Sequence, residues 1–140
     1  MIFQRESGTP KILPYPKTAS TAFANGDPVV VSSGKLVKAG ASATPKTLIG
    51  IITRDVVSTD DDYADANMVG VEVPALNDEF RAEVGTGTAT AAMVGGRYDL
   101  DADGKVNVSA QLTQVVEIVR FISASEVVVK FPAEVLEVTP

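Results

Sequence analysis

The stretch "RYDLDADGKVNVSA" holds the residues whose types and spacing are best suited to chemistry. It places Asp99, Asp101 and Asp103 at alternate positions and follows them with Gly104. The calcium loop of an EF-hand takes oxygen ligands at its first, third and fifth positions and needs a glycine at its sixth, so the spacing matches the start of such a loop. The match ends at the twelfth position, where Ala110 replaces the bidentate glutamate that completes the coordination sphere.

The same stretch also fits a β-hairpin. Its flanks, "GRYDL" and "KVNV", are typical of strands, whereas an EF-hand needs helices on both sides. Asp101, Ala102, Asp103 and Gly104 suit a hairpin loop because Asp and Gly tolerate or require positive φ angles. We therefore predict an outward-facing hairpin turn and keep a weak calcium site as the alternative, which a calcium titration would test.

Two further stretches are acidic or glycine-rich. The sequence "STDDDYADAN" contains four carboxylates, and contiguous like charges usually mark a solvated loop. These residues are Asp60, Asp61, Asp62 and Asp65. The sequence "VGTGTAT" contains Gly85 and Gly87, but it lacks the lysine and the following helix that a phosphate-binding loop needs. We predict no metal site in the first stretch and no nucleotide site in the second.

Residue types that drive most catalysis are missing from the chain. It has no cysteine and no histidine, which excludes thiol nucleophiles and the usual base of a nucleophilic triad. Glu72, Glu79 and Glu83 lie in strand-like segments and are candidates for a pair of catalytic carboxylates, but their spacing is the same as that of outward-facing strand residues. We therefore predict no catalytic residues, no bound cofactor and no enzymatic activity.

Charge and hydropathy restrict the partners. A net charge of −6 disfavours binding to phosphate backbones, so we expect no nucleic-acid partner. No apolar run reaches the length of a transmembrane helix, and residues 1–20 lack the apolar core of a signal peptide. We expect the chain not to associate with membranes. We expect it to be made in the cytoplasm.

The body of the chain is predicted to be all-β. Of its 140 residues, 45% are hydrophobic, which is enough for one packed domain. Short β-branched runs alternate with Gly, Asp and Pro turns, as in a small β-barrel or sandwich. Gly50 lies inside one of these runs and indicates a bulge or a barrel corner. The runs are "DPVVV", "GKLVKAG", "TLIGIITRDVV", "MVGVEVPAL", "EFRAEV", "GRYDL", "KVNV", "QVVEIVRFIS" and "EVVVKFPAEVLEV", with one helical turn expected at residues 89–93.

Residues 1–24 differ in character from residues 25–140. Three prolines favour an extended conformation, and three basic residues against one acidic residue give the segment a net charge of +2. We predict an extended N-terminal arm (1–24) that docks on a partner and a β-barrel-like body (25–140). The predicted arm contacts are its large apolar residues, Ile2, Phe3, Ile12, Leu13 and Tyr15.

The order of these elements resembles that of a known family. "TAFANGDPVVVSSGKLVKAG", "TLIGIITRDV", "VGVEV", "GGRYDLDADGKVNV", "VVEIVRF" and "VVVKF" follow one another as in the capsid decoration (cement) proteins of tailed bacteriophages. The resemblance covers roughly residues 22–132 and rests on short motifs.

The resemblance implies a function without catalysis. It implies a compact β-barrel body, a homotrimer on the outer surface of the mature capsid, and an N-terminal arm that contacts the major capsid protein by strand addition. We therefore expect a virion protein that stabilises the head. The alternative is another structural β module of the virion, in a tail, fibre or baseplate.

Overall fold

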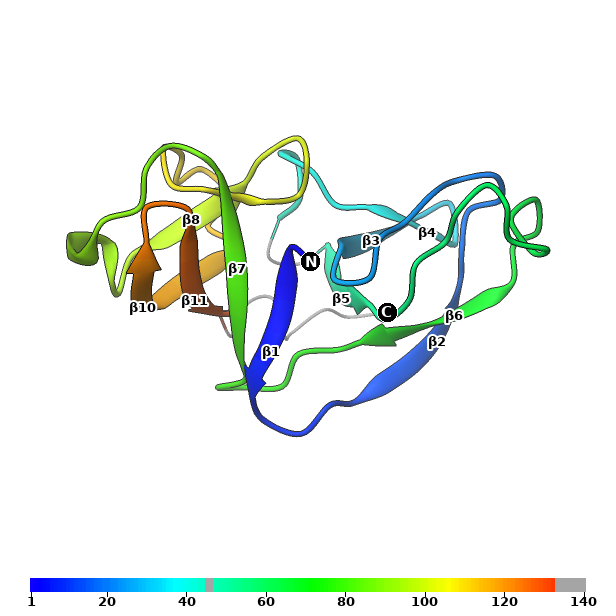
Figure 1. Ribbon diagram of the computed structural model, residues 1–140, viewed down its shortest axis with the longest axis horizontal. Helices are drawn as coiled ribbons and strands as arrows, with labels where there is room; N and C mark the ends of the chain where they lie inside the picture. The colour runs from blue at the N-terminus through cyan, green and yellow to red at the C-terminus, as the bar shows by residue number, and fades with distance from the viewer. Residues whose placement is uncertain (45–46, 133–140) are drawn as a thin grey trace.

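The computed structural model describes residues 1–44 and 47–132, and these residues form two β-sheets that lie side by side (Figure 1). The all-β prediction is confirmed: the sheets account for nearly all of the regular structure, and one 3₁₀ turn, η1 (Ala91–Met93), lies in the predicted helical turn. The last predicted strand begins as expected, but its continuation over residues 133–140 lies outside the described residues.

The first sheet closes into a barrel. Its order is β1-β7-β11-β10-β8-β9, and β9 also pairs in parallel with β7, where Val84 lies opposite Val106. Five strands therefore form a ring, while β1 adds to the free part of β7. Their bounds are β1 (Phe3–Ser7), β7 (Glu79–Thr86), β8 (Arg97–Leu100), β9 (Val106–Asn107), β10 (Val116–Ser123) and β11 (Glu126–Lys130). We call this sheet, with η1 and its loops, the barrel lobe.

The second sheet curls back on itself. Its order is β2-β6-β5-β3-β4, and an isolated parallel bridge between Lys17 and Leu36 joins the two outer strands at one point. Gly50 lies beside a register shift in the pairing of β3 with β5, as the sequence predicted, and a Cβ there would meet the Glu72 carbonyl oxygen at 2.3 Å. The strands are β2 (Ile12–Pro16), β3 (Pro28–Ser32), β4 (Lys35–Lys38), β5 (Leu48–Ile52) and β6 (Met68–Glu72).

Two hydrophobic cores follow from these sheets. We call the second sheet with its loops the second lobe. The larger core fills the barrel lobe and also includes side chains from the second lobe, so it extends across the junction between the two lobes. At its centre, Phe131 packs between Phe3 and Phe80, with ring centroids 5.6 and 5.4 Å apart. The smaller core lies inside the second sheet around Leu36, Ile52 and Val71.

The N-terminal segment is extended, as expected, but it does not stand apart from the body. Residues 3–7 form β1, which pairs with β7, while residues 12–16 form β2, which pairs with β6. The segment therefore contributes one strand to each sheet, and the structure shows no division at residue 24. Proline density suggested an isolated arm. The pairing of both strands could not be foreseen, because their partners, β7 and β6, lie far along the sequence.

Candidate functional site

Asp99, the first residue of the calcium-like pattern, holds a neighbouring loop. It is 4% exposed, and its carboxylate accepts hydrogen bonds from the backbone N–H groups of Leu112 (3.1 Å), Thr113 (2.7 Å) and Gln114 (2.8 Å). Burial opposes ionisation of this carboxyl, but the three backbone donors outweigh it and keep the pKa of Asp99 below its usual value. The oxygens are thus engaged by N–H donors, which compete with a cation.

Asp101, the second residue of the pattern, shapes the hairpin turn. It accepts hydrogen bonds from the backbone N–H groups of Asp103 (2.9 Å) and Lys105 (3.1 Å), and from the Thr86 hydroxyl (3.1 Å). A Cβ on Gly85 would lie 2.2 Å from the second Asp101 oxygen. Gly85 of the "VGTGTAT" stretch therefore makes room for the Asp101 carboxylate, and we assign Gly85 no phosphate-binding role.

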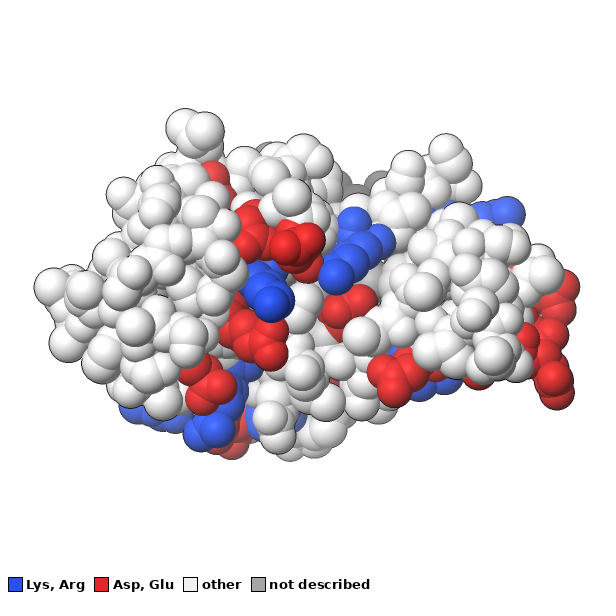
Figure 2. Space-filling view, turned by 45° about the horizontal axis from the view of Figure 1, so that its top comes forward, with Lys and Arg blue, Asp and Glu red and all other residues white. Residues whose placement is uncertain are grey.

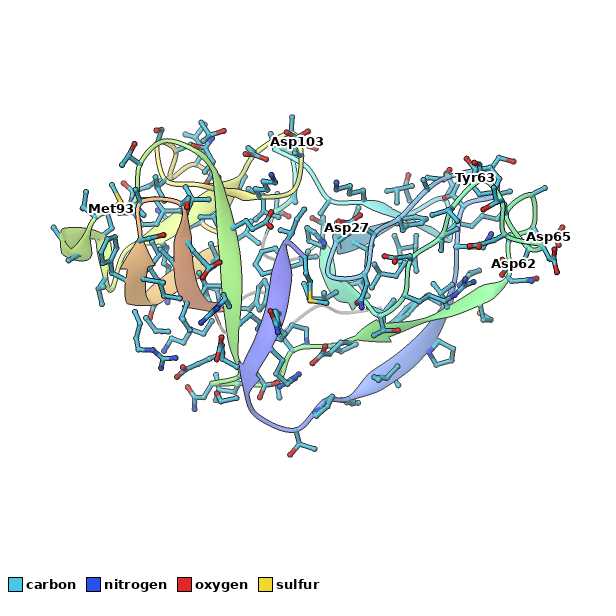
Figure 3. All side chains as sticks on the ribbon, in the orientation of Figure 1. Asp27, Asp62, Tyr63, Asp65, Met93 and Asp103 are labelled. Atoms are coloured by element: carbon cyan, nitrogen blue, oxygen red, sulfur yellow. The ribbon has the colours of Figure 1, made fainter. Side chains whose placement is uncertain are left out.

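The predicted hairpin is confirmed, because β8 and β9 pair antiparallel around the turn. The turn is not wholly outward-facing as predicted: Asp103 is exposed at the top of the molecule in Figure 3, but Asp101 and Gly104 are buried, and Gly104 lies against Ala39 and Pro28. The three carboxylates of the pattern do not converge: one faces the 112–114 loop, one faces its own turn and one is exposed. Across residues 1–44 and 47–132, no group of three acidic, histidine or cysteine side chains is placed to hold a metal ion.

The acidic loop encloses a buried lysine. Lys17 is fully buried, and its Nζ donates to the carbonyl oxygens of Asp62 (2.7 Å), Tyr63 (3.3 Å) and Asp65. Asp62, Tyr63 and Asp65 appear together at the far end of the second sheet in Figure 3. The outer carboxylate of Asp62 pairs with Arg54 at 2.8 Å; slight desolvation opposes ionisation, but this bond lowers the pKa of Asp62. The ammonium group organises this loop from inside.

The three candidate glutamates each pair with a different cation. Glu72 contacts the Arg5 guanidinium, Glu79 accepts a 2.7 Å bond from Arg120, and Glu83 lies 3.5 Å from Lys105. These ion pairs account for the carboxylates, and none of the pairs couples two glutamates in the way that a two-carboxylate catalytic site requires.

The five predicted arm contacts separate into three environments. Ile2 (7% exposed) and Phe3 (1%) belong to the barrel core and cannot contact a partner in this fold. Tyr15 is half-buried and packs against the smaller core. Ile12 (56%) and Leu13 (36%) are exposed. Only two of the five residues therefore offer a substantial apolar surface.

Ile12 belongs to an exposed apolar strip that crosses two strands. Alternation places Ile12, Pro14 and Pro16 of β2 on one face, and the register sets them opposite Glu72, Gly70 and Met68 of β6. We name Ile12, Pro14, Pro16, Met68 and Gly70 the outer strip. The opposite face carries Leu13, Tyr15, Val69 and Val71, of which the two valines are buried.

The five residues of the outer strip carry no side-chain charge, and Glu72 borders the strip beside Ile12. Gly70 allows Ile12 to lie across it, since a Cβ there would be 2.9 Å from the Ile12 methyl carbon. Met68 is 63% exposed at the other end. Sequence reasoning missed Met68 and Gly70, although their two-residue spacing within "MVGVEV" was the available signal.

Two prolines shield the open edge of β2. The Lys17 N–H donates to Asn67 and the Lys11 carbonyl accepts from Val73, so the odd-numbered residues of β2 face β6. The backbone positions of Pro14 and Pro16 therefore face away from β6, where neither residue has an N–H to donate. This edge is poorly suited to the strand addition that the family resemblance implies.

Comparison with known proteins assigns no relative. No protein-family model matches the chain, and no curated protein matches it. Within the described residues, no helix has the length and apolar character needed to cross a membrane.

Proposed function

We propose that this chain is a head decoration (cement) protein of a tailed bacteriophage that binds the outer surface of the mature capsid and stabilises it. The observation that carries the proposal is the outer strip, an apolar surface fixed on two paired strands, with Ile12 and Met68 more than half exposed. Contiguous exposed apolar surface is characteristic of protein-binding sites. The resemblance of the sequence motifs to those of decoration proteins supports the major capsid protein as the partner.

Decoration of a shell requires little affinity from each contact. Copies that bind as trimers engage the capsid at several points, and the effective concentration of the second and third contacts raises the overall affinity. The outer strip suits this mode because a pre-formed strand surface loses little conformational entropy on binding. The N-terminal segment would act through the outward face of β2, with Ile12, while Ile2 and Phe3 support the core.

Co-sedimentation with expanded, undecorated heads of the source virus tests this function. We expect saturable binding at a fixed number of copies per capsomer. Replacing Ile12 and Met68 together by Asp should weaken binding by at least about tenfold, because the strip would then carry charges that must be desolvated on contact. Deletion of residues 1–24 is not a suitable test, since it removes one strand from each sheet.

Leu76→Asp provides the matched control for these variants. Leu76 is 65% exposed but lies in the loop after β6, outside the outer strip. This variant should bind heads like the wild-type chain. Wild-type binding by the Ile12→Asp/Met68→Asp chain would contradict the assignment of the strip. Binding of the wild-type chain to tails instead of heads would support the alternative, a tail, fibre or baseplate module.

A further inference from the structure

One end of the barrel lobe lacks ionisable side chains. Residues 85–96, 106–116 and 121–125 contain no Asp, Glu, Lys or Arg, although 21% of the whole chain is charged and its net charge is −6. In Figure 2 the left-hand part of the barrel lobe is almost entirely white, while red and blue side chains gather near the junction of the lobes and along the lower rim.

These three segments adjoin one another in space. The Ala89 N–H donates to the Ala124 carbonyl at 3.0 Å, and the Val108 N–H donates to the Thr86 carbonyl at 3.0 Å. Residues 121–125 and 106–116 therefore contact residues 85–96 directly. We name the surface formed by the three segments the uncharged end.

Large apolar side chains are exposed on this surface. They are Val94 (46% exposed), Leu112 (93%), Phe121 (40%) and Ile122 (41%). Phe121 and Ile122 are fixed on β10, close to its turn into β11. The uncharged end thus presents four large apolar side chains to solvent, which a single folded domain gains nothing by exposing.

Leu112 is held in place despite its exposure. The three consecutive N–H groups of residues 112–114 are bound by the buried Asp99 carboxylate, and the Gln111 side chain donates to the Arg97 carbonyl at 3.0 Å. The loop that carries Leu112 is therefore anchored on both sides of this residue. An anchored apolar side chain is the arrangement that protein interfaces use, because little entropy is lost on contact.

The charge distribution selects the occupant of this surface. Two copies of a chain with net charge −6 repel each other wherever their acidic surfaces meet, and burying charged groups adds a desolvation penalty. The uncharged end is a surface on which two copies can meet at little of either cost, since its charged neighbours Arg120 and Glu126 lie at its border. We propose that copies of this chain associate through the uncharged end. This inference deepens the proposed function, which requires several copies, by naming the surface they share.

Sedimentation equilibrium of the full chain tests the proposal without any capsid. The wild-type chain should form a defined oligomer within a range of about 1 μM to 1 mM, the range of weak to moderate affinities. Leu112→Glu and Phe121→Glu should each raise the dissociation constant at least about tenfold, because a carboxylate would be buried at the contact. The high exposure of Leu112 makes its replacement harmless to the core, which circular dichroism would verify.

Met68→Glu is the matched control because Met68 is similarly apolar and 63% exposed, but lies on the outer strip. It should leave the oligomer unchanged. A wild-type chain that stays monomeric throughout the range, or equal weakening by Met68→Glu and Leu112→Glu, would overturn the proposal. If the chain is monomeric and Leu112→Glu instead weakens head binding, the uncharged end is a capsid contact. Head binding is measured separately, by co-sedimentation. A chain that does not self-associate would therefore contradict this inference but not the proposed cement function.

Discussion

Asp99 and Lys17 each use one buried ionic group to hold a loop through its backbone. Asp99 accepts from three N–H groups, whereas Lys17 donates to three carbonyl groups. In both cases the buried charge is hydrogen-bonded by backbone groups of an irregular segment. Those backbone groups in turn gain a hydrogen-bond partner that no secondary structure gives them. Spacing in the sequence showed that Asp99 was unusual but suggested a metal ligand. Lys17 carried no signal, because only the fold places a surface-type residue inside the sheet.

Asp99→Asn should make stability less dependent on pH. The pKa of Asp99 is lowered in the folded chain, so its stabilising effect is complete above the unfolded pKa of about 3.9 and is lost as the pH falls through the folded pKa. At pH 7 the variant should be less stable by about 1–2 kcal/mol, since Asn places an N–H₂ group against backbone donors. The difference should shrink as the pH falls below about 4.

Urea unfolding from pH 7 down to 2.5 measures this difference. Asp103→Asn is the control, because Asp103 is exposed on the same hairpin and should give a nearly constant small effect. The free energies of unfolding of the wild type and Asp99→Asn are compared at each pH. If their difference stays the same over the whole pH range, the carboxylate charge is not what stabilises the loop.

The acidic hairpin between β8 and β9 joins the two lobes. Its turn lies against the end of β4 and the start of β3: a Cβ on Gly104 would be 3.0 Å from the Ala39 carbonyl oxygen and 3.0 Å from Pro28. Gly104 also has a φ of +84°, which favours glycine. The glycine that first suggested a calcium loop therefore has two structural reasons to be there.

Gly104→Ala should destabilise the chain more than Gly34→Ala. Both glycines have positive φ, +84° and +79°, so both substitutions incur the same backbone strain of about 1 kcal/mol. A Cβ on Gly34 meets no atom within 4 Å, whereas one on Gly104 presses on the second sheet. Thermal and urea unfolding of the two variants would isolate the contact, and equal losses would mean that the hairpin does not brace the lobes.

Local patterns predicted the elements better than their pairing. The β8–β9 hairpin followed from its Asp-Gly turn, and β10 followed from β-branched residues in "QVVEIVRFIS". The prolines and the net positive charge of residues 1–24 predicted an arm, whereas β1 and β2 pair with strands that lie far away in the sequence. Phe3 lies opposite Ala82, and Ile12 lies opposite Glu72. Such long-range register depends on the whole fold, which is why the exposed outer strip could not be assembled from the sequence.

At the scale of the whole molecule, Arg5 contacts residues of both sheets. From β1 its guanidinium contacts Glu72 at the end of β6, lies 2.9 Å from Asp78, and stacks 5.0 Å from the centre of the Phe80 ring. These partners belong to both lobes and to the segment between them. Because the cluster is largely buried, its ions are stable only as a complete set.

Arg5→Ala should therefore cost about 3 kcal/mol in the free energy of unfolding, since two partly buried carboxylates lose their cation. Arg5→Lys should recover part of that loss, because a lysine keeps the charge but lacks the planar fork and the stacking. Arg120→Ala is the control: it breaks an exposed pair with Glu79 and should cost less than about 1 kcal/mol. Equal losses from Arg5→Ala and Arg120→Ala in urea unfolding would contradict this role.

Ser7 and Glu79 lie opposite each other where β1 pairs with β7. Everything from residue 8 to residue 78, including all five strands of the second sheet, thus departs from and returns to a single point of the barrel lobe. That is the geometry of an inserted module. A short turn from Ser7 to Glu79 would make β1 and β7 a hairpin, and the barrel would keep its strand order while losing the wall formed by Ala39, Leu48 and Ile51. An inserted module can be replaced as a unit, so the proposed capsid-binding strip could change while the barrel lobe keeps its uncharged end.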